Sequence, residues 1–243
     1  SGHATSKNNL VVANANDAII NVDGTLQSVS NNGSSSEGPT DDYRIKPDIT
    51  GNGTGLYSTY ASADDSYDSI TGTSMASPNV TGSLLLLQEH YFNLYGTFMR
   101  ASTLKGLALH TADDAGDTGP DANFGWGLLN TKKAAETLTI AAATSGSTIV
   151  KELTLNQGDT YQLIVQSNGV DPLLASISWT DTGGTVQTVV NDNTSRLVND
   201  LDVRLTNDTV YTPWKLTAAD SNGKGDNTVD PYERIDIDGA SGF

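Results

Sequence analysis

Hydrophobic residues are concentrated most strongly in the run from Met75 to Leu87, which is apolar on nearly every face of a helix. This pattern predicts a helix that is buried inside a domain rather than lying on its surface. The residues from Gly72 onward are small and polar, so we expect a loop that leads straight into the helix. Pro78 is expected in the first turn, where its missing N–H costs nothing. Gly96 is the predicted end of the helix.

Two shorter helices are predicted downstream. Apolar spacing indicates a helix over residues 104–109, with Ser102 as its expected N-terminal cap. Asn130 stands directly before a second amphipathic stretch and is the expected cap of a helix over Thr131–Leu138.

Two strands are predicted upstream of the long helix. A polar loop enters a short apolar strand at residues 10–13. Lys46 and Pro47 impose an extended backbone before Ile49, where a second strand is expected. With the three helices, these strands predict an α/β part that ends near Ala143.

The hydrophobic period changes from about 3.6 to 2 from Thr144 onward. Short alternating stretches separated by Gly, Asn and Asp turns predict an antiparallel, jelly-roll-like β-sandwich. We therefore expect one domain over residues 1–143 and a second over 144–243, with the second truncated at its C-terminal end. The alternating apolar positions are Tyr161, Leu163 and Val165, then Leu173, Ala175, Ile177 and Trp179, and finally Leu201, Val203 and Leu205.

Composition excludes several classes of partner. The 243 residues carry a net charge of −16, which repels nucleic acid and anionic membranes. The longest apolar run is shorter than the roughly 20 residues of a membrane span. Cysteine is absent, which excludes disulfides and thiolate metal sites. This acidic, Gly-rich composition favours a secreted or cell-surface protein.

Ser74 is the candidate for chemistry, because it stands at the mouth of the apolar helix. Unpaired backbone N–H groups and the positive end of the helix macrodipole lie there, which is a suitable place to stabilise an oxyanion. The structural alternative is a serine that only caps a core helix.

Residues 72–78, Gly-Thr-Ser-Met-Ala-Ser-Pro, resemble the nucleophile signature of the subtilisin-like serine proteases, or subtilases, with Ser74 in the nucleophile position. Three other stretches are similar to subtilase segments: Ala-Thr-Ser-Lys-Asn-Asn-Leu at 4–10, Ser-Ser-Glu-Gly-Pro-Thr at 35–40 with Arg-Ile-Lys-Pro-Asp-Ile at 44–49, and Gly-Trp-Gly-Leu-Leu-Asn at 125–130. The chain departs from the family at 50–53, where Thr-Gly-Asn-Gly replaces the usual continuation Ala-Pro-Gly.

The resemblance implies part of a doubly covered parallel sheet, followed by the β-domain of some subtilases. It also implies peptide-bond hydrolysis through an acyl-enzyme on Ser74, whose backbone N–H would be one oxyanion donor. The substrate would be a polypeptide, and no cofactor would be required.

The acid and the base of such an enzyme are not found in the sequence, because the family order is Asp, His, Ser. His90 and His110 follow Ser74 within helical patterns, and His3 lacks the His-Gly-Thr context. We reject all three as the base. The chain is therefore expected to be the C-terminal portion of a longer protease, inactive without the N-terminal half of the catalytic domain.

Two rival functions remain open at this point. Asp117 and Asp181 each begin an Asp-Thr-Gly triplet, which raises an aspartic protease whose two carboxylates share a proton. Against it, the two triplets lie in different predicted domains. The other rival is a catalytically idle binding module, a pseudo-protease in which Ser74 has no function.

Calcium binding has a weaker signal. The stretch at 220–226 begins like a calcium loop, but Lys224 and Pro231 occupy ligand positions and exclude an EF-hand. Looser binding by Asp220, Asp226, Asn227 or Asp230 stays open beside a solvated turn, and the resemblance encourages it, since subtilases often bind calcium. The run Asn199-Asp200-Leu201-Asp202 supplies either ligands or the outward face of a strand.

Overall fold

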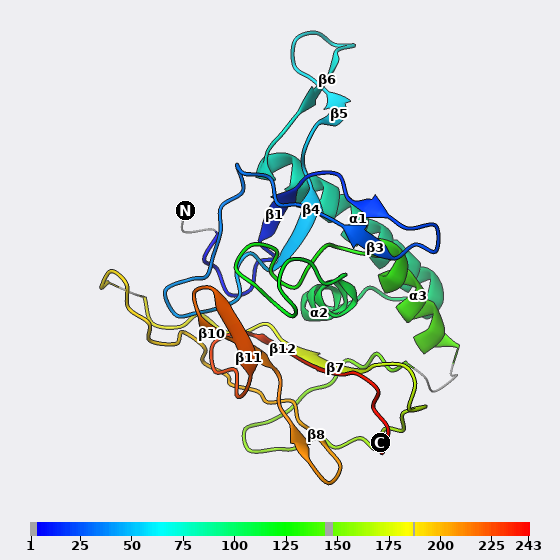
Figure 1. The fold of residues 1–243 in the computed structure, drawn as a ribbon, viewed down its shortest axis with the longest axis vertical. Coiled ribbons are helices and arrows are strands. Elements are labelled where there is room, and N and C mark those ends of the chain that lie inside the picture. Colours follow the sequence, from blue (N-terminus) through cyan, green and yellow to red (C-terminus); the bar gives the residue numbers. More distant parts are fainter. Residues whose placement is uncertain (1–3, 144–147, 187) are drawn as a thin grey trace.

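The computed structural model describes residues 4–143, 148–186 and 188–243 (Figure 1). The helices are α1 (Thr73–Tyr95), α2 (Ala101–Thr111) and α3 (Thr131–Ala142). The strands are β1 (Val12–Ala15), β2 (Ile19–Ile20), β3 (Leu26–Ser28), β4 (Ile49–Asn52), β5 (Leu56–Thr59), β6 (Tyr67–Ile70), β7 (Leu173–Ser178), β8 (Leu205–Thr206), β9 (Val210–Tyr211), β10 (Trp214–Ala218), β11 (Ser221–Lys224) and β12 (Tyr232–Ile237).

The two predicted upstream strands form a parallel pair, β1 with β4, in a register that places Val12 opposite Ile49. Helix α1 packs against both strands. The approach is close: a Cβ on Gly51 would lie 2.6 Å from a methyl carbon of Val80 in α1. Only glycine fits at this position without a shift of the helix. The predicted α/β arrangement of parallel strands under a helix is thus confirmed for this part of the chain.

Helix α1 ends where the sequence predicts. Gly96 adopts a left-handed conformation (φ 71°), and its N–H donates to the carbonyl of Phe92 at 2.8 Å. The start differs from the prediction, because the helix begins at Thr73 and Pro78 therefore lies inside it, beyond the first turn. The missing N–H of Pro78 is the donor that the carbonyl of Ser74 would otherwise accept.

The prediction that α1 is buried on nearly every face is wrong. Ala76, Val80 and Leu87 are buried, whereas Leu85 and Leu86 are 66% and 61% exposed. The elements that pack against α1 are β1, β4, α2 and α3, and Leu85 and Leu86 stay exposed despite these contacts.

The predicted cap of α2 is also wrong, whereas that of α3 is confirmed. Ser102 lies inside α2, which begins at Ala101. The carboxylate of Glu152 lies at this helix start and accepts from the Arg100 N–H at 2.8 Å. For α3, the side chain of Asn130 accepts from the backbone N–H of Lys133 at 2.9 Å.

The C-terminal part contains antiparallel pairs of short strands, namely β7 with β12, β10 with β11 and β8 with β9. Strand β7 confirms the alternation predicted at 173–179, and β8 covers only the end of the stretch at 201–205. No strand forms at 161–165 among the described residues, because alternation alone supplies no neighbouring strand for the backbone groups. The predicted boundary falls on residues 144–147, outside the described residues, and stays a prediction.

The two parts share a hydrophobic core. Trp126 packs edge-on against Tyr232 of β12, with ring centroids 5.0 Å apart. Arg234, also on β12, donates to the carbonyl of Leu109 in α2 at 3.0 Å. Figure 1 shows α2 between the β1–β4 pair and the β7–β12 pair. The C-terminal part is therefore packed directly against the helices that support α1.

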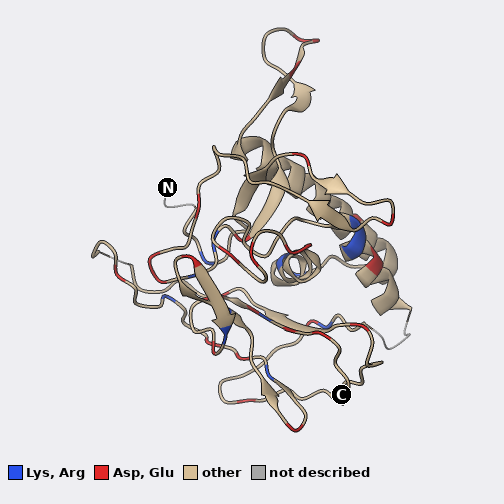
Figure 2. Cartoon of the chain, in the orientation of Figure 1, with Lys and Arg blue, Asp and Glu red and all other residues tan. Residues whose placement is uncertain are grey.

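A buried ion pair links the same two parts. The Lys7 ammonium donates to the Asp181 carboxylate at 2.5 Å and to the carbonyl of Thr182 at 2.9 Å. Burial opposes ionisation of Asp181, but hydrogen bonds from Lys7, Val198 and Asn199 outweigh it and lower its pKa to about 2. Figure 2 shows that acidic residues lie mostly on loops. No described helix has the length and hydrophobicity needed to cross a membrane.

Replacing Asp181 by alanine should lower the free energy of unfolding by about 3–5 kcal/mol, because the Lys7 charge stays buried without its partner. The double replacement of Lys7 by methionine and Asp181 by leucine should cost less than the sum of the two single changes. Glu136→Ala removes one member of an exposed pair with Lys132 and serves as the control, with an expected change of about 1 kcal/mol or less. Chemical denaturation compares the parent and Asp181→Ala with Lys7→Met, Asp181→Leu, their double variant and Glu136→Ala. Additive costs of Lys7→Met and Asp181→Leu in the double variant would contradict this interpretation.

Asp230 should make stability depend on pH. Burial raises its pKa to about 7, while its carboxylate accepts the Ile45 N–H at 3.1 Å. Between pH 4 and 7 the unfolded chain releases this proton and the folded chain keeps it, so unfolding becomes easier as the pH rises. Asp230→Asn should therefore gain about 1 kcal/mol or more relative to the parent over this window, since one pKa unit corresponds to about 1.4 kcal/mol. A difference that is constant from pH 4 to 7 would refute the raised pKa.

Candidate active site

Ser74 is the second residue of α1 and is exposed at the N-terminal end of the helix. The carbonyl of Gly72 accepts from the N–H groups of Met75 at 2.9 Å and Ala76 at 3.2 Å. Gly72 has no side chain that could cap the helix, so no side-chain acceptor from this position reaches the N–H groups of Thr73 and Ser74. These N–H groups and the helix macrodipole place partial positive charge beside the Ser74 hydroxyl. The arrangement suits a nucleophilic oxygen and the oxyanion that its attack would create.

The loop before Ser74 is fixed by the end of β4. The N–H of Gly72 donates to the carbonyl of Gly53 at 2.9 Å. A Cβ on Gly53 would lie 2.5 Å from the Gly72 oxygen and 2.7 Å from the backbone nitrogen of Ala76. Because both of these are backbone atoms, the first turn of α1 sits against β4 with no room for adjustment.

Asn14 of β1 is a buried residue at this site that sequence reasoning missed. It is 0% exposed, and a Cβ on Gly53 would lie 2.6 Å from its Oδ1. Its Nδ2 has no hydrogen-bond partner among the described residues. The available signal was one amide side chain inside the otherwise apolar run at 11–15. Asn14 therefore buries an amide group beside Gly53, which itself lies against the first turn of α1.

The two described histidines bond to groups other than Ser74. A ring nitrogen of His90 lies 2.9 Å from the hydroxyl of Thr139, and one of His110 lies 2.9 Å from the hydroxyl of Ser176. Burial lowers the pKa of His110 to about 4, which keeps the ring neutral at pH 7. His3 lies outside the described residues.

The two Asp-Thr-Gly triplets have different surroundings. Asp181 is held as a buried anion by Lys7, and its pKa is about 2 despite its burial. Asp117 lies in a loop, where its own N–H donates to Asp121 at 3.3 Å. A shared proton requires two carboxylates in contact, as in an aspartic protease. The environment of Asp181 does not favour that role.

A hairpin of β5 and β6 runs directly into the Ser74 loop and extends away from the body of the molecule (Figure 1). Tyr57 and Tyr67 stack across it with ring centroids 5.7 Å apart, and both are exposed. Asp64 and Asp65 are exposed in its connecting turn. Ser74 is thus flanked by an aromatic and acidic arm that a polypeptide could contact.

Ser74 lines neither of two cavities in the described part of the chain. One of about 500 Å³ borders α1 at Asn79 and Ser83. Another of about 550 Å³ lies between α2 and α3 and the strands β7 and β12, with His110 and Arg234 in its wall.

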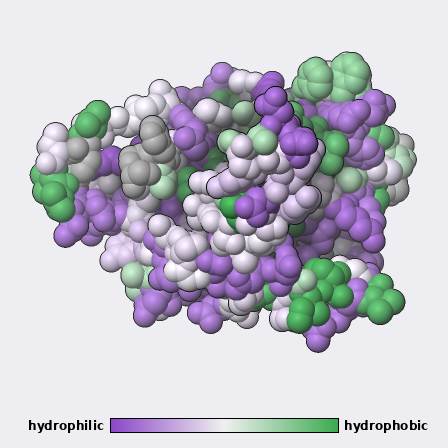
Figure 3. All heavy atoms as spheres, turned by 90° about the horizontal axis from the view of Figure 1, so that it is seen from above, coloured by the Kyte–Doolittle hydropathy of each residue, from purple (hydrophilic) through white to green (hydrophobic). Residues whose placement is uncertain are grey.

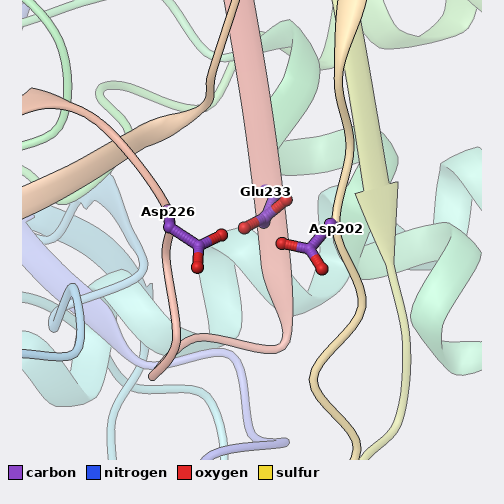
Figure 4. A group of neighbouring side chains, drawn as sticks. All are labelled: Asp202, Asp226 and Glu233. Carbon is purple, nitrogen blue, oxygen red and sulfur yellow. The ribbon is translucent and has the colours of Figure 1, made fainter.

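The residues considered for calcium are separated by the fold. The carboxylates of Asp202, Asp226 and Glu233 lie close together and form a carboxylate cluster (Figure 4). Sequence reasoning did not single out Glu233. Asn227 and Asp230 instead bond to each other at 3.1 Å in the buried interior. Asp220 is exposed, and its carboxylate accepts from the Ser221 hydroxyl at 3.3 Å.

Gly53→Ala should destabilise the protein by about 1–3 kcal/mol, because the added methyl group meets two backbone atoms that cannot move independently. The control is Gly33→Ala, where a Cβ has nothing within 4 Å and the expected change is about 0.5 kcal/mol or less. Urea denaturation of the three proteins tests this contact. Equal stability of the two variants would show that β4 does not fix the Ser74 loop.

Comparison with known proteins identifies the family to which the chain is similar. The model of the subtilase family (Peptidase_S8) matches residues 1–127, which is half of the chain. The chain is 32% identical to subtilisin DY of Bacillus licheniformis over 136 residues, covering 56% of this chain and 44% of that protein. It is 36% identical over 73 residues to an extracellular serine protease of Serratia marcescens, covering 30% of this chain and 6% of that protein.

Among solved structures, fervidolysin of Fervidobacterium pennivorans, a keratinolytic enzyme related to subtilisin, matches with a TM-score of 0.43 and 18% identity, over 96% of this chain and 27% of that one. The chain spans less than half the length of each of these three relatives. The family match covers the loop and helix start that present Ser74. Because the family model matches half of the chain, the chain belongs to the subtilase family.

Proposed function

We propose that this protein acts as a serine endopeptidase in which Ser74 attacks the carbonyl carbon of a peptide bond. The observation that carries the proposal is the exposed Ser74 hydroxyl at the uncapped N-terminus of α1, within the subtilase sequence at 72–78. The Ser74 oxygen forms the acyl-enzyme, the amine half of the substrate leaves, and water then releases the acid half. The Ser74 N–H is the proposed oxyanion donor.

The proposed reaction needs a base that removes the Ser74 proton and returns it to the leaving amine. His90 bonds to Thr139 and His110 bonds to Ser176, so neither described histidine is placed as the base for Ser74. We therefore place the base, its orienting acid and the side-chain oxyanion donor on upstream polypeptide, the N-terminal half of the catalytic domain. The 243-residue chain alone would then be inactive.

The exposed side of α1 supports such a partner. Leu85 and Leu86 are both more than 60% exposed in the middle of the helix, and Phe92 is 44% exposed one to two turns further along. On the face drawn in Figure 3, hydrophobic residues gather in separate patches with hydrophilic residues between them. An apolar helix face of this kind is normally covered. The N-terminal half of the domain is its proposed cover.

The C-terminal part has a supporting role in this proposal. Its predicted β-sandwich would hold α2 through Tyr232 and Arg234, and so support the helices behind Ser74. A secreted or cell-surface location fits the acidic surface and the extracellular relative from Serratia. A net charge of −16 disfavours nucleic acid as a partner, which leaves polypeptide as the proposed substrate.

Labelling by a serine-directed fluorophosphonate tests the nucleophile. The longer protein that contains this chain should be labelled, and Ser74→Ala should abolish the labelling. Ser77→Ala, an exposed serine one turn along the same helix, is the matched control and should be labelled normally. Subtilisin, a member of this family, loses about 2 × 10⁶-fold in kcat without its nucleophile or base, so a loss of similar size is expected for Ser74→Ala.

The isolated 243-residue chain should remain unlabelled, because it lacks the proposed base. Absence of labelling in a folded longer protein would reject the peptidase and favour the catalytically idle binding module. Labelling that survives Ser74→Ala would place the nucleophile elsewhere.

A further inference from the structure

The hairpin of β5 and β6, here called the arm (residues 56–70), presents two aromatic rings on one face. Tyr57 lies opposite Ser69 and Tyr67 lies opposite Thr59, so both tyrosines belong to the same face of this two-stranded sheet. Their rings stack with centroids 5.7 Å apart, and the two residues are 72% and 57% exposed. Exposed aromatic rings of this kind are typical of surfaces that bind another polypeptide.

The arm carries negative charge without a compensating cation of its own. Asp64 and Asp65 are exposed in its turn, and Asp68 is exposed on the face opposite the tyrosines. No lysine or arginine occurs in the sequence between Lys46 and Arg100, a stretch that includes the whole arm. Figure 2 shows acidic residues and no basic residue on the arm. A cation that reaches the arm therefore meets carboxylates without a competing positive charge from the same segment.

The base of the arm is bonded to the loop that presents the proposed nucleophile. The Gly55 N–H donates to the Thr71 hydroxyl at 2.9 Å. The Gly72 N–H donates to the Gly53 carbonyl, also at 2.9 Å. Both strands of the arm therefore begin and end beside the loop that carries Ser74.

The length of the arm limits which part of a substrate can reach it. Tyr67 precedes Ser74 by seven residues. Because an extended chain spans at most about 3.6 Å per residue, the Cα atoms of Tyr67 and Ser74 lie no more than about 25 Å apart. An extended polypeptide covers the same distance with about seven residues. A substrate cleaved at Ser74 can therefore place a side chain on the arm within about seven residues of the scissile bond.

We propose that the arm binds a lysine or arginine side chain of the substrate, which makes basic polypeptides the preferred substrate class. This inference rests on the proposed peptidase function and names the substrates of that site. An ammonium or guanidinium group is attracted both to the face of a tyrosine ring and to carboxylates. Asp65 lies two residues before Tyr67, so one basic segment can contact both kinds of group. An acidic segment would be repelled, and an uncharged segment would leave the carboxylates unused.

The test is peptide binding to the longer protein that contains this chain, with Ser74→Ala so that no cleavage occurs. Two fluorescent peptides differ only in having lysine or glutamine within about seven residues of the centre on each side. Fluorescence anisotropy should give a Kd about threefold or more lower for the lysine peptide, since contact of a cation with one exposed ring corresponds to about two- to fivefold. Salt at about 1 M should remove most of the preference, because it screens exposed charges.

Two double variants test the charge of the turn. Asp64→Asn with Asp65→Asn should abolish most of the preference for lysine. Asp208→Asn with Asp220→Asn is the matched control, because it removes the same charge from the turns of the β8–β9 and β10–β11 hairpins. This control should keep the preference. All four aspartates are exposed, so both double variants should fold.

Two variants of Tyr67 test the aromatic face. Tyr67→Phe keeps the ring and should retain the preference for lysine. Tyr67→Leu keeps only an apolar side chain and should lose about two- to fivefold of the preference. In the longer protein with Ser74 intact, Tyr67→Leu should raise KM for the lysine peptide and leave kcat unchanged, because the arm binds substrate without contacting the reacting atoms.

Equal Kd values for the lysine and glutamine peptides would overturn the proposal. A preference that survives both Tyr67→Leu and the Asp64→Asn, Asp65→Asn double variant would also overturn it. Failure of the proposed peptidase function would appear instead as absent fluorophosphonate labelling of Ser74, which the binding measurement does not use.

Nitration of tyrosines, mapped by mass spectrometry, tests whether the arm is free to bind substrate. Tyr57 and Tyr67 should be nitrated in the longer protein alone and protected when the lysine peptide is bound. Protection without peptide would show that upstream polypeptide or a second copy of the chain covers the arm, and would overturn the proposal.

Discussion

The close contact between β4 and the first turn of α1 is the constraint on which the rest of the structure depends. Gly51 and Gly53 bring the strand so near the helix that an added Cβ would meet Val80 or the backbone of the turn. Because the strand end cannot shift, the loop that carries Ser74 has one position relative to β1 and β4. The helix start then presents Ser74 to solvent at a helix N-terminus that has no side-chain cap. The chemistry proposed for Ser74 follows from this packing rather than from the serine alone.

Strand β12 has a comparable role in the C-terminal part. Three consecutive residues, Tyr232, Glu233 and Arg234, contact the shared core, the carboxylate cluster and α2 respectively. The ion pair between Lys7 and Asp181 fixes the same two parts at a second place. Helix α2 contacts α1 directly, so the packing of β12 against α2 also supports α1. The C-terminal part is therefore connected mechanically to the region of Ser74, although it contributes no atom to that site among the described residues.

Local signals in the sequence predicted the three helices and the strands β1, β4 and β7, but not the absence of a strand at 161–165 among the described residues. Long-range contacts explain much of what these signals missed. The end of α1 at Gly96 and the Asn130 cap depend on neighbouring residues and could be read directly. The start of α2 could not, because Glu152 reaches it from fifty residues away. The exposure of Leu85 and Leu86 was missed because an apolar pattern indicates only that a helix face is suited to burial. It does not indicate whether a neighbouring element of the same chain packs on that face. Glu233 was missed because its neighbours in the cluster come from other segments.

The central claim is that α1 and Ser74 belong to a catalytic unit completed by polypeptide outside these 243 residues. Hydroxyl-radical footprinting of Leu85 and Leu86 tests it most directly, with Ile164, which is 98% exposed, as the internal reference. In the isolated chain both leucines should be oxidised readily. In the longer protein they should be protected while Ile164 stays reactive. Equal oxidation of Leu85 and Leu86 in the two proteins would show that nothing covers α1, and would contradict the account.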